Sequence, residues 1–391
     1  MEHITCELCG EKIHAVQTHL KKVHGIDSSN PCTLNEYKER FPEAPLLSER
    51  AKRHIEQKRI EQSVEPSSPK KDLNGEKEAL HEVFSLGKIK AARKPSGDPI
   101  MISMCKQEDF KELVPKIDNG YVFDIDLLKT TLMGLEANIP TYLYGHAGVG
   151  KSTLPEQICA RTNRRMIRVP HTGQTEEAQI VGQWTVKKHK DEETGKLVAE
   201  TIFELGPLPL AMKNGWIYLA DEYDRAYPHV LSVYQSVLEG KALYIKEADA
   251  ENRIIEPHPD FRIVATGNSN GAGDETGLYQ ATVIQDAATF ERFGIVLRVD
   301  YMPPKQEVAI VQAQTNICKP DAEAIIEFCT SIRREHPSTI SLTLGPRVAI
   351  NIANIGIMRD DYKKGVEVAF ANRLPESERE AALKIAERIF G

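Results

Sequence analysis

The fold of this chain is decided by the stretch Thr141-Tyr-Leu-Tyr-Gly-His-Ala-Gly-Val-Gly-Lys-Ser152. It contains a short apolar strand, then glycines, lysine and serine in the spacing Gly-x4-Gly-Lys-Ser, and a helical pattern follows. The glycines let the backbone curl so that several N–H groups face one phosphate, and the helix adds the partial positive charge of its N-terminus. The sequence therefore predicts a phosphate-binding loop that begins at Gly145.

Two carboxylates follow a second apolar run, Trp216-Ile-Tyr-Leu-Ala-Asp221-Glu222. Acidic residues at a strand end are more often merely solvated, but a phosphate loop upstream favours a catalytic reading. Ser152 and Asp221 are then the expected Mg²⁺ ligands, and Glu222 is the expected general base that polarises the attacking water. Asn268 ends the next apolar run and could orient this water, although an asparagine there is also common turn chemistry.

Short apolar runs alternate with helical patterns between residues 101 and 304, which is typical of an α/β fold with a parallel sheet. The predicted strands are Thr141–Tyr144, Met166–Val169, Trp216–Ala220, Arg262–Thr266 and Ile295–Val299. The predicted C-terminal helices are Glu307–Gln314, Asp321–Glu335, Pro346–Met358 and Ser377–Phe390. We therefore predict four regions: a Cys/His-rich domain at 1–45, a polar linker, partly disordered or helical, at 46–100, an α/β domain at 101–304 and a helical lid domain at 305–391.

Several longer stretches are more specific than the nucleotide motifs. They are Asp221-Glu-Tyr-Asp224, Val237-Leu-Glu239, His258-Pro-Asp-Phe261 and Gly273-Asp-Glu-Thr-Gly-Leu-Tyr279. Together with the phosphate loop, they resemble the MoxR-type AAA+ ATPases, a P-loop family, and most closely the CobS-like branch found in cobaltochelatases. The resemblance runs from about residue 123 to the C-terminus.

This resemblance implies an ATP-hydrolysing ring, expected to be a hexamer, with ATP bound between subunits. It matches Asn268 to the first sensor, Arg292 to an arginine finger and Arg347 to the second sensor. It also implies hairpin insertions at 180–208 and 241–257, and a partner protein with a von Willebrand A domain. The residues expected to bind the nucleotide are Gly145, His146, Ala147, Gly148, Val149, Gly150, Lys151, Ser152, Thr153 and Asp221.

Cysteine and histidine ligands for a metal gather near the N-terminus. Cys6, Cys9, His19 and His24 have a spacing that suits one tetrahedral Zn²⁺, with His14 as an alternative ligand. His24-Gly and the segment Glu36-Tyr-Lys-Glu-Arg-Phe41 resemble the zinc finger of the Ros/MucR regulators. Lysines there could contact DNA or RNA, but interleaved acids leave protein docking open.

Bulk properties narrow the function classes. The chain has seven cysteines, an odd number that argues against a disulfide framework. No long apolar run or leader-like N-terminus is present, so we expect a cytoplasmic protein without membrane contact. The leading hypothesis is a partner-remodelling ATPase that the finger recruits to nucleic acid or to a client. The alternatives are a cobaltochelatase motor subunit and a zinc-finger DNA-binding protein in which ATP acts as a switch.

Overall fold

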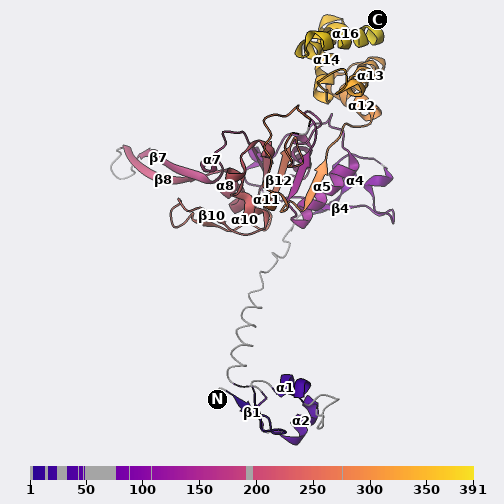
Figure 1. Cartoon of the computed structure of the whole chain (residues 1–391). Helices are drawn as coiled ribbons and strands as arrows, with labels where there is room; N and C mark the ends of the chain where they lie inside the picture. Colours follow the sequence, from indigo (N-terminus) through magenta and orange to yellow (C-terminus); the bar gives the residue numbers. More distant parts are fainter. Residues whose placement is uncertain are drawn as a thin grey trace. The chain divides into compact units, whose positions relative to one another are not determined.

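The computed structural model describes residues 3–13, 16–23, 33–42, 44–46, 48, 76–87, 89–106, 108–190, 197–274 and 276–391 (Figure 1). The chain divides into two compact units, Met1–Lys70 and Lys71–Gly391. None of the helices among the described residues is long and apolar enough to cross a membrane.

Five parallel strands form the central sheet of the larger unit, in the order β13-β5-β12-β9-β6. Their bounds are β5 Thr141–Tyr144, β6 Met166–Pro170, β9 Ile217–Asp221, β12 Arg262–Gly267 and β13 Ile295–Arg298. All five predicted strands are present, and the predicted α/β class with a parallel sheet is confirmed. Every residue of β9 and β12 is buried, which explains why these strands read as continuous apolar runs.

Side chains that alternate along the strands enter two different cores. Leu143, Leu219 and Val264 pack on one face with helices α5 (Ile125–Ala137) and α6 (Thr153–Arg161). Their strand neighbours, including Tyr142 and Tyr218, pack on the other face. The helices there are α8 (Pro207–Asn214), α9 (Pro228–Leu231) and α10 (Tyr234–Leu238). The sheet is therefore covered on both faces, and its carboxyl edge is where polar chemistry can gather.

The segment from Glu76 onward corrects the predicted linker. It forms β3 (Lys77–Ala79), α4 (Leu80–Val83), the short helix η1 (Lys90–Ala92) and β4 (Met101–Ser103). Leu80, Phe84 and Ile102 are almost fully buried in the same core as α5. A few well-placed apolar side chains suffice to dock this polar-looking segment, so the linker ends earlier than composition suggested.

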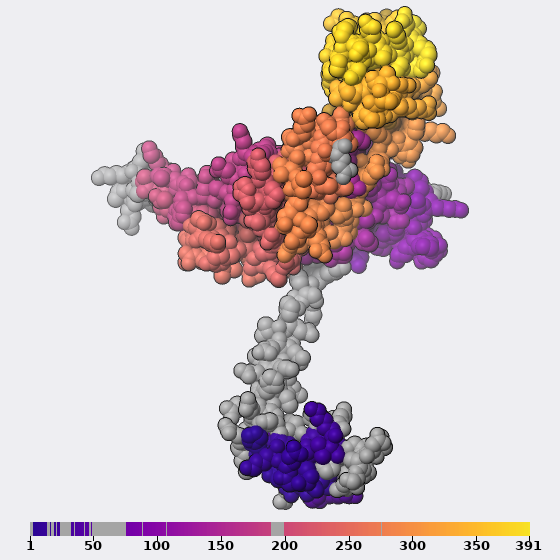
Figure 2. All heavy atoms as spheres, viewed as in Figure 1, coloured from indigo at the N-terminus to yellow at the C-terminus, as the bar shows by residue number. Residues whose placement is uncertain are grey.

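Two hairpins extend from the α/β domain. β7 (Gly182–Lys190) pairs with β8 (Leu197–Leu205) within the hairpin insertion predicted at 180–208. β10 (Leu243–Tyr244) pairs with β11 (Ile254–Ile255) in the second predicted insertion. Trp184 is half-exposed on β7 and donates its indole N–H to the carbonyl of Glu247, which lies between β10 and β11. In Figure 2 the longer hairpin projects from the body of this domain.

The C-terminal part of the larger unit is all helical and has its own core. Its helices are α12 Pro304–Thr315, α13 Lys319–Glu335, α14 Pro346–Arg359, α15 Tyr362–Ala369 and α16 Glu376–Phe390. Four of them were predicted, and α15 was not. The arrangement confirms the expected C-terminal helices.

The smaller unit contains a two-stranded hairpin, β1 (Ile4–Thr5) with β2 (Lys12–Ile13), and two helices, α1 (Val16–Val23) and α2 (Leu34–Arg40). Its core includes Ile4, Val16, Leu20 and Tyr37. The Tyr37 hydroxyl accepts a hydrogen bond from the Glu7 amide at 2.9 Å. This contact joins α2 to the hairpin.

Candidate active site

The predicted phosphate loop connects β5 to α6 and depends on its glycines. Gly145, Gly148 and Gly150 have φ angles of 150°, 81° and 95°, which side chains rarely tolerate. A Cβ at Gly145 would also collide with the carbonyl oxygen of Val299, just after β13. The loop is therefore packed against the neighbouring strand end, and its conformation requires the Gly-x4-Gly spacing.

Lys151 lies inside this loop. Its ammonium donates hydrogen bonds to the carbonyl oxygens of Gly145 and His146, each at 2.8 Å, and to Asn268 Oδ1 at 3.0 Å. Burial lowers the pKa of Lys151 to about 8, although nearby carboxylates, Asp224 first among them, act in the opposite direction. The structure thus brings Lys151 and Asn268, 117 positions apart in the chain, into direct contact.

Asp221 ends β9 and is 3% exposed. Its Oδ1 accepts hydrogen bonds from the hydroxyls of Ser152 and Thr266, both at 2.5 Å, and its Oδ2 accepts from Arg168 Nε at 2.8 Å. Burial raises the pKa of Asp221, but these hydrogen bonds and the Arg168 charge outweigh that effect and lower it overall. The paired oxygens of Ser152 and Asp221 suit a hard cation such as Mg²⁺.

Glu222 follows Asp221 in a left-handed conformation, with φ 53° and ψ 38°. Left-handed backbone is unfavourable for a glutamate by about 1–2 kcal/mol and occurs preferentially at functional sites. The Glu222 amide donates to Thr266 Oγ1 at 3.2 Å, and its carboxylate pairs with Arg225 at 2.8 Å. The side chain is about one-third exposed, at 37%. It is therefore accessible to water beside the Asp221 strand end.

Asp224 anchors the segment that carries Asn268. This fully buried carboxylate accepts hydrogen bonds from the Asn268 amide at 2.7 Å, the Ser269 amide at 2.8 Å and the Ser269 hydroxyl at 2.9 Å. All three reach the same oxygen, Oδ2. Asn268 is thus positioned through its backbone by Asp224 while its side chain meets Lys151.

Arg347 lies at the start of α14 and lines a cavity of about 240 Å³ beside the phosphate loop. The helical domain contacts the loop directly here, since a Cβ at Gly345 would lie 2.9 Å from the Ala147 carbonyl oxygen. The cavity mixes loop residues with apolar and polar side chains from both domains. Its lining residues are Asp118, Gly120, Tyr121, Val122, Gly148, Val149, Gly150, Thr153, Met302, Ile310, Gln314, Pro346, Arg347 and Ile350.

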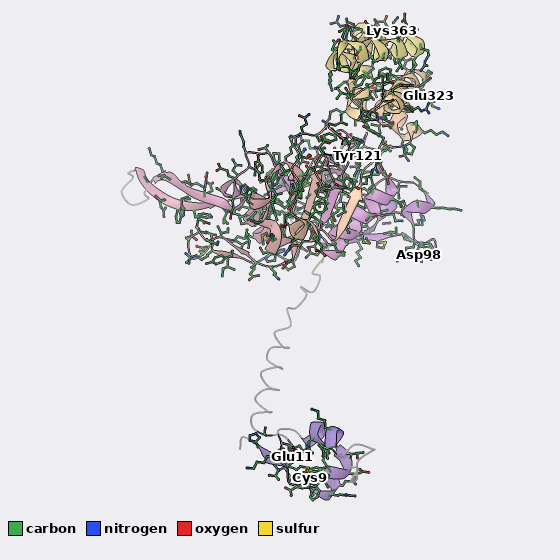
Figure 3. The ribbon with its side chains drawn as sticks, in the orientation of Figure 1. Cys9, Glu11, Asp98, Tyr121, Glu323 and Lys363 are labelled. Carbon is green, nitrogen blue, oxygen red and sulfur yellow. The ribbon has the colours of Figure 1, made fainter. Side chains whose placement is uncertain are left out.

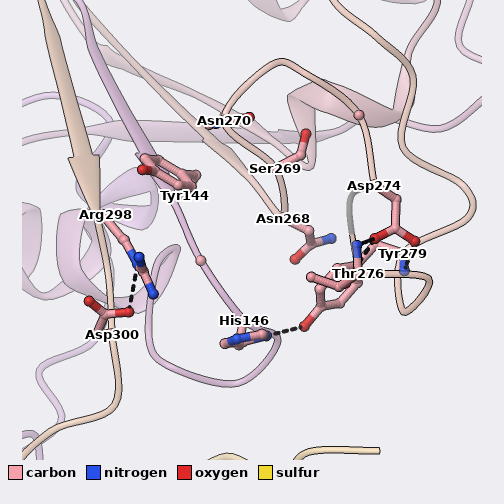
Figure 4. Close-up of a pocket in the computed structure, with 12 residues that line it drawn as sticks. Tyr144, His146, Asn268, Ser269, Asn270, Asp274, Thr276, Tyr279, Arg298 and Asp300 are labelled. Carbon is pink, nitrogen blue, oxygen red and sulfur yellow. Dashed lines mark hydrogen bonds and ion pairs between the residues drawn. The ribbon is translucent and has the colours of Figure 1, made fainter. Parts of the chain in front are cut away.

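Arg292, the expected finger, is not brought to this loop. Its guanidinium donates to Glu239 Oε1 at 2.7 Å and to the carbonyl of Ala288 in α11 (Ala287–Phe290). It lines neither the cavity that holds Arg347 nor a second cavity at the loop, which is lined by His146, Asn268 and Tyr279 among others (Figure 4). Arg292 therefore forms its hydrogen bonds and ion pair away from the phosphate loop of its own chain.

Comparisons with known proteins agree with this arrangement. The AAA domain of the dynein-related subfamily matches residues 140–283. The aerobic cobaltochelatase subunit CobS of Sinorhizobium sp is 32% identical over 286 residues, which cover 71% of this chain and 83% of CobS. The chain belongs to the AAA+ ATPase family that includes CobS. It is accordingly an ATP-hydrolysing enzyme.

Two further relatives of this AAA+ ATPase are more distant. The gas vesicle ATPase GvpN1 of Halobacterium salinarum is 25% identical, over 57% of this chain and 63% of GvpN1. NorQ of Paracoccus denitrificans is 23% identical, over 65% of this chain and 87% of NorQ. These relatives support the MoxR-like type of AAA+ ATPase that the motifs predicted.

Sequence reasoning assigned no role to four side chains that the structure places at the ATPase site. Arg168 and Thr266 bond Asp221, Asp224 bonds the Asn268 segment, and Tyr279 contacts the phosphate loop. Asp224 and Tyr279 lie in the family-specific stretches Asp221–Asp224 and Gly273–Tyr279, so the resemblance could have marked them as candidate site residues. Arg168 and Thr266 lie on strands β6 and β12 and carried no motif.

The N-terminal Cys/His cluster lies in the smaller unit. The ligand atoms of Cys6, Cys9 and His19 lie within 4.8 Å of one another, and Cys9 Sγ is 3.2 Å from His19 Nε2. Glu11 Oε2 is 3.8 Å from the other ring nitrogen of His19. Figure 3 labels Cys9 and Glu11 on this unit. His24, the fourth predicted ligand, and the alternative His14 lie outside the described residues.

Proposed function

We propose that this ATPase assembles into a ring, expected to be a hexamer, that hydrolyses ATP between subunits to remodel a protein partner. The observation that supports this proposal is that the chain places most of the expected catalytic residues together but holds the expected arginine finger elsewhere. Lys151, Asp221, Glu222 and Asn268 converge at the carboxyl edge of one sheet, whereas Arg292 is held elsewhere by Glu239. A neighbouring subunit is the natural source of the missing arginine.

In the proposed reaction, the phosphate-loop amides and Lys151 bind the β- and γ-phosphates. Ser152 and Asp221 would hold Mg²⁺, which supplies charge neutralisation for the transferring phosphoryl group. Glu222 accepts a proton from the attacking water, and Asn268 orients that water. Arg168, bonded to Asp221 and 2.9 Å from Glu156, keeps the Asp221 carboxylate ionised and fixed.

The cavity lined by Tyr121 and Arg347 is the proposed site of the nucleoside. Tyr121, labelled in Figure 3, and the apolar side chains of Met302, Ile310 and Ile350 provide a surface on which a purine can pack. Arg347 lies at the phosphate-loop end of the same cavity. As the second sensor, Arg347 would contact the phosphates and so couple nucleotide binding to the position of the helical domain, because Arg347 belongs to α14.

Mixed rings test the shared site. Lys151→Met removes the phosphate contact but leaves Arg292, and Arg292→Ala removes the finger but leaves the phosphate loop. Each variant alone should be nearly inactive. A one-to-one mixture should regain about a quarter of wild-type turnover, because about one interface in four then joins an intact loop to an intact arginine. Rings that form yet regain no activity, or full activity of Arg292→Ala alone, would contradict the proposal.

We also propose that the smaller unit binds one Zn²⁺ through Cys6, Cys9, His19 and His24. The three described ligand atoms are close enough for a tetrahedral site, and Glu11 faces the second nitrogen of His19 as a supporting carboxylate would. The full chain should contain one zinc per subunit by elemental analysis. Cys9→Ser should lose it, whereas Cys318→Ser, at the exposed start of α13, should keep it. Equal zinc in both variants would reject the site.

The zinc unit would recruit DNA, RNA or the client of the motor, and a protein with a von Willebrand A domain is the expected partner. Gel shifts of the full chain across a salt series distinguish these roles, because phosphate contacts weaken steeply with salt. Binding at low salt favours nucleic acid. If no nucleic acid binds at low salt, the remaining role for this unit is protein docking, and the alternative of a DNA-binding protein in which ATP is a switch is rejected.

A second candidate is a motor subunit of a cobaltochelatase, favoured by the 83% coverage of CobS. This candidate requires that the chain form a complex with chelatase partner subunits. Co-purification with such partners from the source organism would support it. A purified chain that remodels a different client in an ATP-dependent way, without them, would reject it.

A further inference from the structure

The loop that follows the carboxyl end of β12 contacts the phosphate loop through Tyr279. Asp274 shapes this loop, because its Oδ1 accepts hydrogen bonds from the Thr276 amide and hydroxyl at 2.9 and 2.8 Å. Its Oδ2 accepts from the Tyr279 amide at 2.6 Å. In Figure 4 the Tyr279 side chain extends toward His146, to which a dashed line joins its hydroxyl.

The Tyr279 hydroxyl makes two contacts with the phosphate loop. It accepts a hydrogen bond from the Ala147 amide at 3.0 Å and lies 3.1 Å from His146 Nδ1. Burial raises the pKa of Tyr279, so the hydroxyl keeps its proton at neutral pH. It can therefore accept from Ala147 and donate to His146 at the same time. A phenylalanine would retain the ring and lose both contacts.

These contacts lie at the γ-phosphate end of the loop. Lys151, the side chain that reaches the β- and γ-phosphates, bonds the carbonyl oxygens of Gly145 and His146. The opposite end of the loop, from Gly150, leads into α6 and lines the nucleoside cavity. An ADP molecule would thus engage the α6 end, whereas only ATP extends to the end that Tyr279 holds.

A second aromatic ring also contacts His146. Tyr301, just after β13, stacks on His146 with 5.6 Å between ring centroids and 5° between planes. Arg333 of the helical domain lies 3.8 Å above the Tyr301 ring. His146 therefore contacts both Tyr279 and Tyr301, and of these two tyrosines Tyr279 is the one that accepts a hydrogen bond from the loop backbone.

We infer that Tyr279, held by Asp274, is a positioning residue that fixes the His146–Ala147 end of the phosphate loop and favours ATP over ADP. This inference rests on the proposed ATP site. The loop continues to Val283, whose amide bonds the Asp224 carbonyl at 2.7 Å, and then to α11 and Arg292. Tyr279 therefore links the γ-phosphate end of one site to the segment that carries the proposed finger.

The test compares the affinities of Tyr279→Phe for two nucleotides in the full chain, adenylyl imidodiphosphate and ADP. The variant should bind the triphosphate analogue about 3- to 10-fold more weakly, the value expected for one or two lost hydrogen bonds, and ADP within about twofold of wild type. Tyr244→Phe, at an exposed tyrosine of β10, is the matched control and should change neither affinity.

Asp274→Asn provides a second variant in case Tyr279→Phe fails to fold. It retains the size of the side chain and removes one acceptor, so it should shift the triphosphate-to-diphosphate ratio in the same direction. The double variant should lose little beyond the worse single variant, because both act through one contact. Equal weakening of both nucleotides, or an unchanged ratio in both variants, would overturn the inference. Failure of the wild-type chain to bind either nucleotide would instead reject the proposed function.

Discussion

Nucleotide binding by the wild-type chain should weaken above pH 8, and Lys151→Met should abolish this pH dependence. Burial lowers the pKa of Lys151 to about 8, from an ordinary value of 10.5, despite the opposing charges of Asp224, Asp221 and Glu222. Phosphates bind the ammonium form, so binding must retain or take up the proton. Well below pH 8 nearly all free chains already carry the proton, and the affinity should level off there.

The magnitude follows from the fraction of protonated lysine. At pH 9, one unit above a pKa of about 8, only about one free site in eleven carries the proton, against about ten in eleven at pH 7, so the apparent Kd should rise about 10-fold between these pH values. In the free chain the Lys151 ammonium donates to Gly145, His146 and Asn268, and these three hydrogen bonds require its charged form.

Titration with a fluorescent ATP analogue between pH 7 and 9.5 measures this effect. Lys151→Met should bind weakly at every pH with no step near 8, and Lys213→Met, at an exposed lysine on α8, should behave as wild type. A wild-type Kd that is constant across this range, or the same rise in Lys151→Met, would refute the assignment of Lys151 as a buried, phosphate-binding ammonium.

Two further predictions concern the loop and its support. Gly145→Ala should lower the melting temperature strongly, because the new Cβ would collide with the Val299 carbonyl. Gly240→Ala is the control: Gly240 also has a positive φ, but its Cβ would meet open space, so the melting temperature should fall only slightly. Equal shifts in both variants would contradict the packing argument. Asp224→Asn should lower kcat about 10-fold, because it loosens the Asn268 backbone, and should also weaken ATP binding, because the Asp224 charge raises the pKa of Lys151. A kcat within twofold of wild type at saturating ATP would reject the positioning role of Asp224.

The phosphate loop, the five strands and the Asp221–Glu222 pair were predictable because each follows from local rules. Apolar runs of four to six residues mark buried parallel strands, and Gly-x4-Gly-Lys-Ser marks a loop that only glycines can form. The sequence also predicts that these motifs lie at one edge of the sheet, because the carboxyl ends of parallel strands lie at the same edge. Asn268 was a weak signal alone and gained meaning from its contact with Lys151.

The contacts that complete the site could not be read from spacing. Arg168 bonds Asp221 across 53 positions, and Tyr279 bonds Ala147 across 132 positions. Their partners depend on which strands are neighbours and on how a loop folds back. Helix α15 was missed because it is short and contains Gly365, whose Cβ would lie 2.6 Å from the Ile352 carbonyl. That glycine permits close helix packing, which a helical pattern does not reveal.

The most direct test of the central claim is the turnover of Glu222→Gln beside its affinity for ATP. The wild-type chain should hydrolyse ATP, and the variant should bind adenylyl imidodiphosphate with unchanged affinity. Its kcat should fall at least about 100-fold, because glutamine retains the shape of the side chain but cannot accept a proton from water. Turnover of Glu222→Gln within twofold of wild type would contradict the account of this site.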